Sequence, residues 1–452
     1  MDRRRKLKYG IFAGIAAVIL IACVAAAFIF IQRANKTRYV QSSASSAEKD
    51  SAAGLQYGTE AQNKETEKNT DTSVSSEASS EEIQSEDNTD GSNTKENDEL
   101  ETGTPSGEPS APSGSGQSAL ERARSILSGM SVEEKVGQMF IARCPQSGAA
   151  QKAADYHLGG YILFGRDFQG KTKEQVISDI QSYQDAASVS LFIGVDEEGG
   201  TVNRVSLNPN LRAVPFWSPQ ELYASGGFSL IRSDTLEKCR LLPSLGINVN
   251  FAPVCDVSQN PADFIYARSF GRDANQTAEY IRNVTQVMSS EGMGAVLKHF
   301  PGYGNNADTH TGIAYDNRPY ETFQNSDFLP FKAGIENGAG IVLVSHNIVA
   351  CMDGQYPASL SSRVHEILRG ELGFSGVIVT DDLAMDGIRD FVSDDRAAVL
   401  AVQAGNDLLC CTDFETQIPT VIDAVINGEI SEQRIDESVL RILMLKISLG
   451  II

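Results

Sequence analysis

Eight short apolar segments within residues 118–452 restrict the folds that this chain can adopt. They are MFIARC (139–144), GGYILF (159–164), SLFIGVD (190–196), INVNFAPVCDV (247–257), GAVLKHF (294–300), GIVLVSHN (340–347), GVIVTDD (376–382) and NDLLCCTD (406–413). Nearly continuous apolar runs separated by helical patterns are typical of parallel strands that are buried on both faces. Eight such strands in one domain predict an α/β fold, a single closed (β/α)8 barrel of the TIM type rather than a doubly wound sheet.

Five of these segments have polar side chains at or near their C-terminal ends. These side chains are Asp196, Asp256, Lys298 with His299, His346 with Asn347, and Asp381. One carboxylate at the end of a strand is often only the N-cap of the next helix, but five polar strand ends together favour a common site. Because the C-terminal strand ends of a barrel form its active-site face, we expect these distant residues to converge there.

An apolar run from Tyr9 to Ile31 is flanked by basic residues. It is long enough to cross a hydrocarbon core of roughly 30 Å as a helix, so residues 9–31 are interpreted as a single-pass transmembrane signal-anchor. More basic residues precede the run than follow it, which places residues 1–8 in the cytoplasm and the later domain outside the cell membrane. The alternatives are a cleaved signal peptide and lipid attachment at Cys23.

Residues 32–117 are rich in Ser, Glu, Asp, Asn, Thr and Gly, and few of them are aromatic or branched apolar residues. Such a segment cannot bury enough apolar surface to offset the entropy of ordering, so a disordered acidic linker is predicted. It supplies much of the formal net charge of -21, which disfavours nucleic acid as a partner. Residues 118–452 remain as one globular domain, in which a capping box of Ser131 and Glu134 is expected to start the first helix.

The seven cysteines show no zinc-ligand spacing, and no cofactor is predicted. Cys255 and the Cys410–Cys411 pair lie in apolar strand-like segments, which favours inert buried thiols. An extracytoplasmic location would also permit disulfides.

The segment KHFPGYGNNADTH (298–310) contains two of the five histidines and begins at the end of the fifth apolar run. Pro301, Gly302 and Gly304 favour a flexible turn over a helix. Asp308 stands two residues before His310, where a carboxylate could bind one ring nitrogen, set the tautomer and make the imidazole a proton donor and acceptor. Alternatively, Asp308 only caps the turn beside an exposed histidine.

Several motifs match a known family in the same order along the chain. LKHFPGYGNNADTHTG (297–312), VDEEGGTVNR (195–204), ARSFGRD (267–273), GINVNFAPVCDV (246–257) and VIVTDDLAM (377–385) resemble the β-N-acetylglucosaminidases of glycoside hydrolase family 3. The resemblance extends from Ser131 across the domain. It implies a (β/α)8 fold and a retaining double displacement at a terminal β-linked N-acetylglucosamine.

The resemblance also implies roles for individual residues. The resemblance places the nucleophile on Asp381. Asp382 is the alternative, and only one of the two can readily face the pocket because successive strand side chains point to opposite faces. The acid/base falls on His310 with Asp308 as its partner, although retaining glycosidases ordinarily use two carboxyl groups. Tyr303 and a shorter loop depart from the family pattern. The substrate-binding positions that the resemblance implies are Asp196, Arg204, Arg268, Lys298 and His299.

Other functions stay open at this point. A metal-dependent barrel hydrolase would use His299, His310, His346 and Asp381 as ligands. A catalytically inactive wall-binding protein could have the same layout of anchor, linker and barrel, and some relatives transfer the sugar to phosphate instead of water. The natural carbohydrate could be peptidoglycan fragments, chitin oligosaccharides or glycans, and the sequence does not predict the oligomeric state.

Overall fold

The computed structural model describes residues 114–452. The expected cytoplasmic segment (1–8), membrane anchor (9–31) and nearly all of the linker (32–117) lie outside these residues. Among residues 114–452, no helix combines the length and apolarity needed to cross a membrane.

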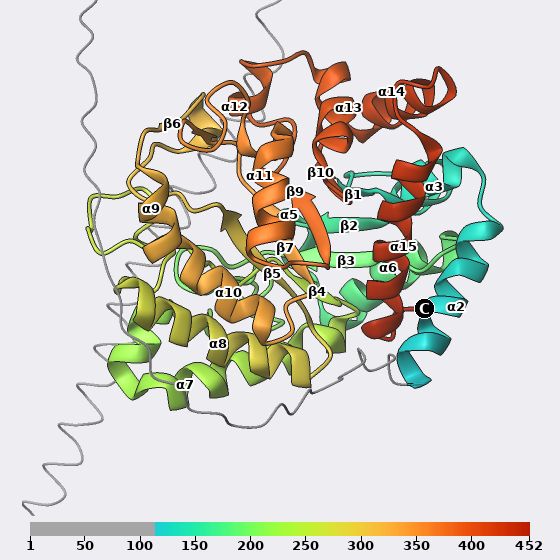
Figure 1. The fold of residues 1–452 in the computed structure, drawn as a ribbon. Helices are drawn as coiled ribbons and strands as arrows, with labels where there is room; N and C mark the ends of the chain where they lie inside the picture. The colour runs from blue at the N-terminus through green and yellow to red at the C-terminus, as the bar shows by residue number, and fades with distance from the viewer. Residues whose placement is uncertain (1–113) are drawn as a thin grey trace, which may run out of the picture. The chain divides into compact units, whose positions relative to one another are not determined.

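Eight parallel strands form the centre of this domain (Figure 1). They are β1 (Phe140–Arg143), β2 (Gly160–Leu163), β3 (Phe192–Val195), β4 (Val249–Asn250), β5 (Gly294–Phe300), β7 (Ile341–Val344), β9 (Val377–Thr380) and β10 (Leu409–Cys411). Neighbouring strands follow the order β10-β1-β2-β3-β4-β5-β7-β9. A parallel bridge between Val379 and Leu408 joins β9 to β10 and closes the barrel. Each predicted apolar segment contains one of these strands, so the predicted barrel is confirmed.

The strand register brings the polar segments to one end of the barrel. Leu163 pairs with Val195, and Val344 pairs with Thr380. The residues that directly follow these strands, such as Asp196 and Asp381, therefore emerge on the same face.

Helices lie around the strands (Figure 1). They are α2 (Gly114–Ser128), α3 (Val132–Gln138), α4 (Ala149–Asp155), α5 (Gly165–Phe168), α6 (Lys173–Ala186), α7 (Pro219–Leu241), α8 (Ala274–Ser290), α9 (Tyr320–Thr322), α10 (Phe328–Glu336), α11 (Ser362–Glu366), α12 (Asp386–Arg389), α13 (Asp394–Ala404), α14 (Phe414–Ile426) and α15 (Glu432–Ser448). Helix α8 packs against α7 and α10, and α13 packs against α14. An additional two-stranded parallel sheet, β6 (Tyr315–Asp316) and β8 (Ile348–Val349), was not predicted.

The capping box at the start of α3 is confirmed. The Ser131 hydroxyl accepts the Glu134 N–H at 3.3 Å, and the Glu134 carboxylate accepts the Ser131 N–H at 2.8 Å. However, the expectation that this is the first helix is wrong, because α2 precedes it. Helix α2 buries Ala123 and packs against α15, a partner far away in sequence.

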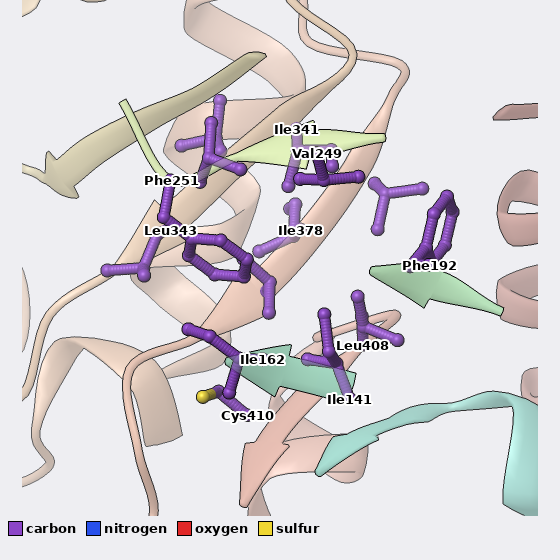
Figure 2. Close-up of a cluster of buried hydrophobic side chains, with 14 of the residues drawn as sticks. Ile141, Ile162, Phe192, Val249, Phe251, Ile341, Leu343, Ile378, Leu408 and Cys410 are labelled. Carbon is purple, nitrogen blue, oxygen red and sulfur yellow. The ribbon is translucent and has the colours of Figure 1, made fainter. Parts of the chain in front are cut away.

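Alternate strand residues fill the barrel interior (Figure 2). The buried side chains labelled there are Ile141, Ile162, Phe192, Val249, Phe251, Ile341, Leu343, Ile378, Leu408 and Cys410. Gly194 leaves space for the ring of Phe251, since a Cβ at this position would lie 2.6 Å from the Phe251 Cε2 atom. This closely packed apolar interior supports the polar residues at the C-terminal ends of the strands.

The thiols behave as predicted. Cys255, Cys410 and Cys411 are buried and free, and burial raises the pKa of each well above its ordinary value. A high pKa keeps a thiol protonated and unreactive.

We expect Gly194→Ala to lower the free energy of unfolding by about 1–3 kcal/mol, because the added methyl group would force the Phe251 ring to move. Urea unfolding of the wild type and the variant measures the difference. Gly370→Ala is the control, because a Cβ there meets no heavy atom within 4 Å. Equal unfolding midpoints for the two variants would contradict the assigned packing.

Candidate active site

A buried ion-pair network occupies the C-terminal ends of β3 and β5. The Lys298 ammonium lies 2.7 Å from an oxygen of Asp196 and 2.5 Å from an oxygen of Glu198. Glu198 also accepts two hydrogen bonds from the Arg268 guanidinium, at 3.0 and 2.8 Å. The Glu198 carboxylate therefore joins Lys298 to Arg268, and Asp196 is attached to the same network through Lys298.

Glu198 is a member of this network that the sequence analysis did not single out. Burial alone would raise the pKa of Glu198, but Arg268 and Lys298 hold it far below its ordinary value. The sequence shows two successive glutamates after Asp196, and nothing in the motif itself indicates which of them contacts the cations. The other glutamate, Glu197, accepts the backbone N–H groups of Arg204 and Val205 at 2.8 and 2.7 Å, so it shapes the loop.

Arg204 stands somewhat apart from this network. Its guanidinium carbon lies 5.4 Å from the centre of the Phe164 ring, and that of Arg143 lies 4.4 Å from the same ring. The Nε atom of Arg204 is buried and has no hydrogen-bond partner among the described residues. Arg204 therefore keeps a donor that a ligand could use.

His299 is held between Arg268 and Asp256. Its Nδ1 atom lies 2.7 Å from a carboxylate oxygen of Asp256, and its Nε2 atom lies 3.1 Å from Nη2 of Arg268. A guanidinium can only donate, so Nε2 is the acceptor and Nδ1–H donates to Asp256. Asp256 was expected only as a polar strand end, and the structure gives it this orienting contact.

Asp308 and His310 form the predicted pair. The His310 Nδ1 atom lies 2.6 Å from a carboxylate oxygen of Asp308, and the same oxygen accepts the His310 backbone N–H at 3.0 Å. This bond raises the pKa of His310, partial burial opposes the increase, and the nearby Asp381 carboxylate adds to it. The His310 side chain is 57% exposed, so it can reach a bound molecule.

The Asp381 carboxylate directly follows β9 and accepts the backbone N–H of Asp382 at 2.9 Å. Burial would raise its pKa, but His346, His299 and His310 together hold it below its ordinary value, which keeps the carboxylate ionised. The side chain of Asp382 is used in the fold instead. It accepts the backbone N–H of Ala384 at 2.9 Å and also bonds to the Thr412 hydroxyl.

His346 and Asn347 were expected to line the site without an assigned role. The His346 Nε2 atom lies 3.0 Å from the Asp382 carbonyl oxygen and therefore donates to it, while Nδ1 lies 2.8 Å from the Ser359 hydroxyl. Burial lowers the pKa of His346. Both polar atoms of the Asn347 side chain are buried without a partner among the described residues, which leaves them open to a ligand.

The structure supplies no ligand set for the metal-dependent alternative. Among residues 114–452, no three His, Cys, Asp or Glu side chains gather in a way that could hold a metal ion. Both ring nitrogens of His299 and of His346 already have protein partners.

The fold and the site together indicate a class of protein. A carboxylate and an imidazole–carboxylate pair at the active-site end of a barrel can supply the two groups that hydrolysis of a glycosidic bond uses, with a histidine where most such enzymes have a second carboxyl group. These features are those of a glycoside hydrolase.

Comparison with known proteins identifies the family. Residues 131–445 match the glycosyl hydrolase family 3 N-terminal domain, and the chain belongs to this family.

Among curated relatives, the chain is 34% identical over 264 residues to a beta-hexosaminidase of Nitrosomonas eutropha, a match that covers 57% of this chain and 74% of the relative. It is also 30% identical over 330 residues to the beta-hexosaminidase LpqI of Mycobacterium tuberculosis, covering 70% of this chain and 83% of the relative. A solved family 3 beta-N-acetylglucosaminidase from Paenibacillus sp. str. FPU-7 is similar with a TM-score of 0.66 at 33% identity. This match covers 71% of the present chain but 63% of the Paenibacillus chain.

We expect Glu198→Gln to lower the free energy of unfolding by roughly 3 kcal/mol or more, because Lys298 and Arg268 would lose a shared buried counter-charge. The pKa of Glu198 is depressed in the folded state, so its contribution is present above the ordinary carboxyl pKa and is lost as the pH falls. Denaturant unfolding at neutral and acidic pH should therefore show a difference that shrinks on acidification.

The control for this measurement is Glu366→Gln. Glu366 and its partner Arg363 are 66% and 62% exposed, so their ion pair contributes about 0–1 kcal/mol. A Glu198 variant that is as stable as this control would show that the network does not depend on that charge.

We expect the His310 imidazole to titrate above the ordinary histidine pKa and Asp308→Asn to lower its pKa, because the carboxylate stabilises the imidazolium. NMR titration of the ring resonances measures both values. His365 serves as an internal reference, since burial lowers its pKa and its ring bonds to the Ser361 carbonyl oxygen and not to this pair. An unchanged His310 titration in the variant would exclude Asp308 as the cause.

Proposed function

We propose that this protein is a retaining, exo-acting β-N-acetylglucosaminidase that releases terminal β-linked N-acetylglucosamine. The observation that carries the proposal is the place of the Asp308–His310 pair, joined at 2.6 Å in the loop after β5, at the same end of the barrel as Asp381, which directly follows β9. One ionised carboxylate and one imidazole with a raised pKa act on each other electrostatically. The curated relatives named beta-hexosaminidase support the same activity.

The first chemical step forms a covalent intermediate. A carboxylate oxygen of Asp381 attacks the anomeric carbon, and the glycosidic bond breaks with its electron pair leaving on the aglycone oxygen. Protonated His310 donates its Nε2 proton to that oxygen, while Asp308 stabilises the imidazolium before the transfer. The products are a glycosyl ester on Asp381 and a neutral imidazole.

The second step reverses these roles. Neutral His310 removes a proton from water, the water oxygen attacks the anomeric carbon, and the ester bond to Asp381 breaks. Two inversions at the same carbon retain the β configuration. The charged groups Asp196, Lys298 and Arg268, with His299 and Arg204, are proposed to bind and orient the sugar hydroxyls.

The expected anchor and linker complete the proposal. With a transmembrane helix over residues 9–31 and a linker over residues 32–117, the catalytic domain would act outside the cell membrane. Cell-wall fragments or chitooligosaccharides are the substrates that suit this location.

We expect Asp381→Asn to lower kcat/KM for an aryl N-acetyl-β-glucosaminide by more than about a thousandfold, because no covalent intermediate can form. An activated fluorosugar that keeps the 2-acetamido group should label the wild type at Asp381, as located by peptide mass spectrometry. A label on Asp382 or on another residue would overturn the assignment.

The same assay separates the alternative functions. Loss of activity with a chelator would indicate the metal-dependent enzyme, and no activity on any N-acetylglucosaminide would indicate a binding protein. A sugar phosphate formed on addition of phosphate would indicate phosphorolysis. Activity that is independent of both additions supports the proposed hydrolase.

A further inference from the structure

Tyr303 connects the fixed end of the barrel to the loop that carries His310. Only 1% of this residue is exposed. Its backbone N–H donates to Asp256 at 2.7 Å, and Asp256 also binds His299. The Tyr303 ring contacts the His299 ring edge-on with 5.1 Å between centroids. Both the backbone and the ring of Tyr303 are thus held by the ends of the central strands.

The Tyr303 hydroxyl bonds to the residue between the two members of the acid/base pair. Its oxygen lies 2.5 Å from the hydroxyl oxygen of Thr309. Thr309 is fully buried, although its neighbours Asp308 and His310 have side chains that are 28% and 57% exposed. The buried hydroxyl pair therefore lies beneath an exposed catalytic pair.

Asp308 and His310 orient each other, but this contact is local. It spans two residues of the same turn, and so it cannot determine where the turn sits over the barrel. The contact between Tyr303 and Thr309 spans six residues and reaches the side chain that is anchored on Asp256. On the other side, a Cβ at Gly387 would lie 3.1 Å from the Thr309 carbonyl oxygen, so helix α12 closely backs the same residue.

Tyr303 also lies near the proposed nucleophile. Burial raises the pKa of Tyr303, and the Asp381 carboxylate raises it further, so the phenol remains protonated and able to hydrogen-bond.

We propose that Tyr303 and Thr309 form a hydroxyl latch that positions His310 for proton transfer to the leaving group. This inference rests on the proposed function, in which His310 is the acid. A general acid must come within hydrogen-bond reach of the glycosidic oxygen, and a displacement of about 1 Å can cost on the order of a hundredfold in rate. Tyr303 is a positioning residue and takes no part in the bond changes.

The test is the dependence of kcat/KM on the acidity of the leaving group. A 2,4-dinitrophenyl leaving group needs almost no protonation, whereas a phenyl leaving group depends on the acid. We expect Tyr303→Phe, which keeps the ring, to slow the phenyl N-acetyl-β-glucosaminide by about tenfold or more and the dinitrophenyl substrate by less than about twofold. Thr309→Val should behave in the same way, and the double variant should be no worse than either single variant.

Two controls make the outcome decisive. Tyr161→Phe removes another buried tyrosine hydroxyl, one that donates to the Ala149 carbonyl at 2.7 Å, and it should leave both substrates unaffected. His310→Ala should show the strongest dependence on the leaving group. The latch is wrong if His310→Ala shows that dependence on the leaving group and Tyr303→Phe does not. It is also wrong if Tyr303→Phe slows both substrates equally. In either case the proposed function stands. If His310→Ala shows no such dependence, the proposed acid and the latch both fail.

Discussion

The active end of this barrel depends on Glu198, a buried carboxylate held between Lys298 and Arg268. Unpaired charges cannot remain in so dry an environment, so each member of this group requires the others. The network joins the end of β5 to the loops after β3 and β4. It therefore does two things with the same atoms, because it fastens three parts of the barrel together and presents Asp196, Lys298 and Arg268 at the active-site face.

A second carboxylate, Asp256, connects this network to the proposed reacting groups. One oxygen of Asp256 binds His299, and the other accepts the Tyr303 N–H, so the proposed sugar-binding end and the loop of the proposed acid/base share an anchor. The proposed nucleophile and acid then differ in character. Asp381 directly follows β9, whereas His310 lies in a turn after β5 and has an exposed side chain. A fixed nucleophile and an accessible acid suit a reaction in which the leaving group and then water must pass the same imidazole.

Much of the barrel could be predicted because each strand can be recognised from a short stretch of sequence. Each apolar run is long enough for one buried strand, and the polar residues at the ends follow from where strands stop. The contact between Asp308 and His310 was also predictable, since two residues of one turn are necessarily close. Helix α2 was missed because its apolar face is short and becomes informative only when α15 packs against it.

Other features depended on contacts between distant segments. Strict alternation from Ile378 through Thr380 would turn Asp382 inward, but the strand ends at Thr380, and Thr412 and the Ala384 N–H bind the Asp382 carboxylate. By itself, the sequence determined the eight strands, the polar ends and the local contact of Asp308 with His310, because each is encoded within a few residues. Only the tertiary structure decided that Glu198 joins the cations and that Tyr303 reaches Thr309. These contacts depend on which buried groups meet when distant segments pack together, so no local sequence pattern predicts them.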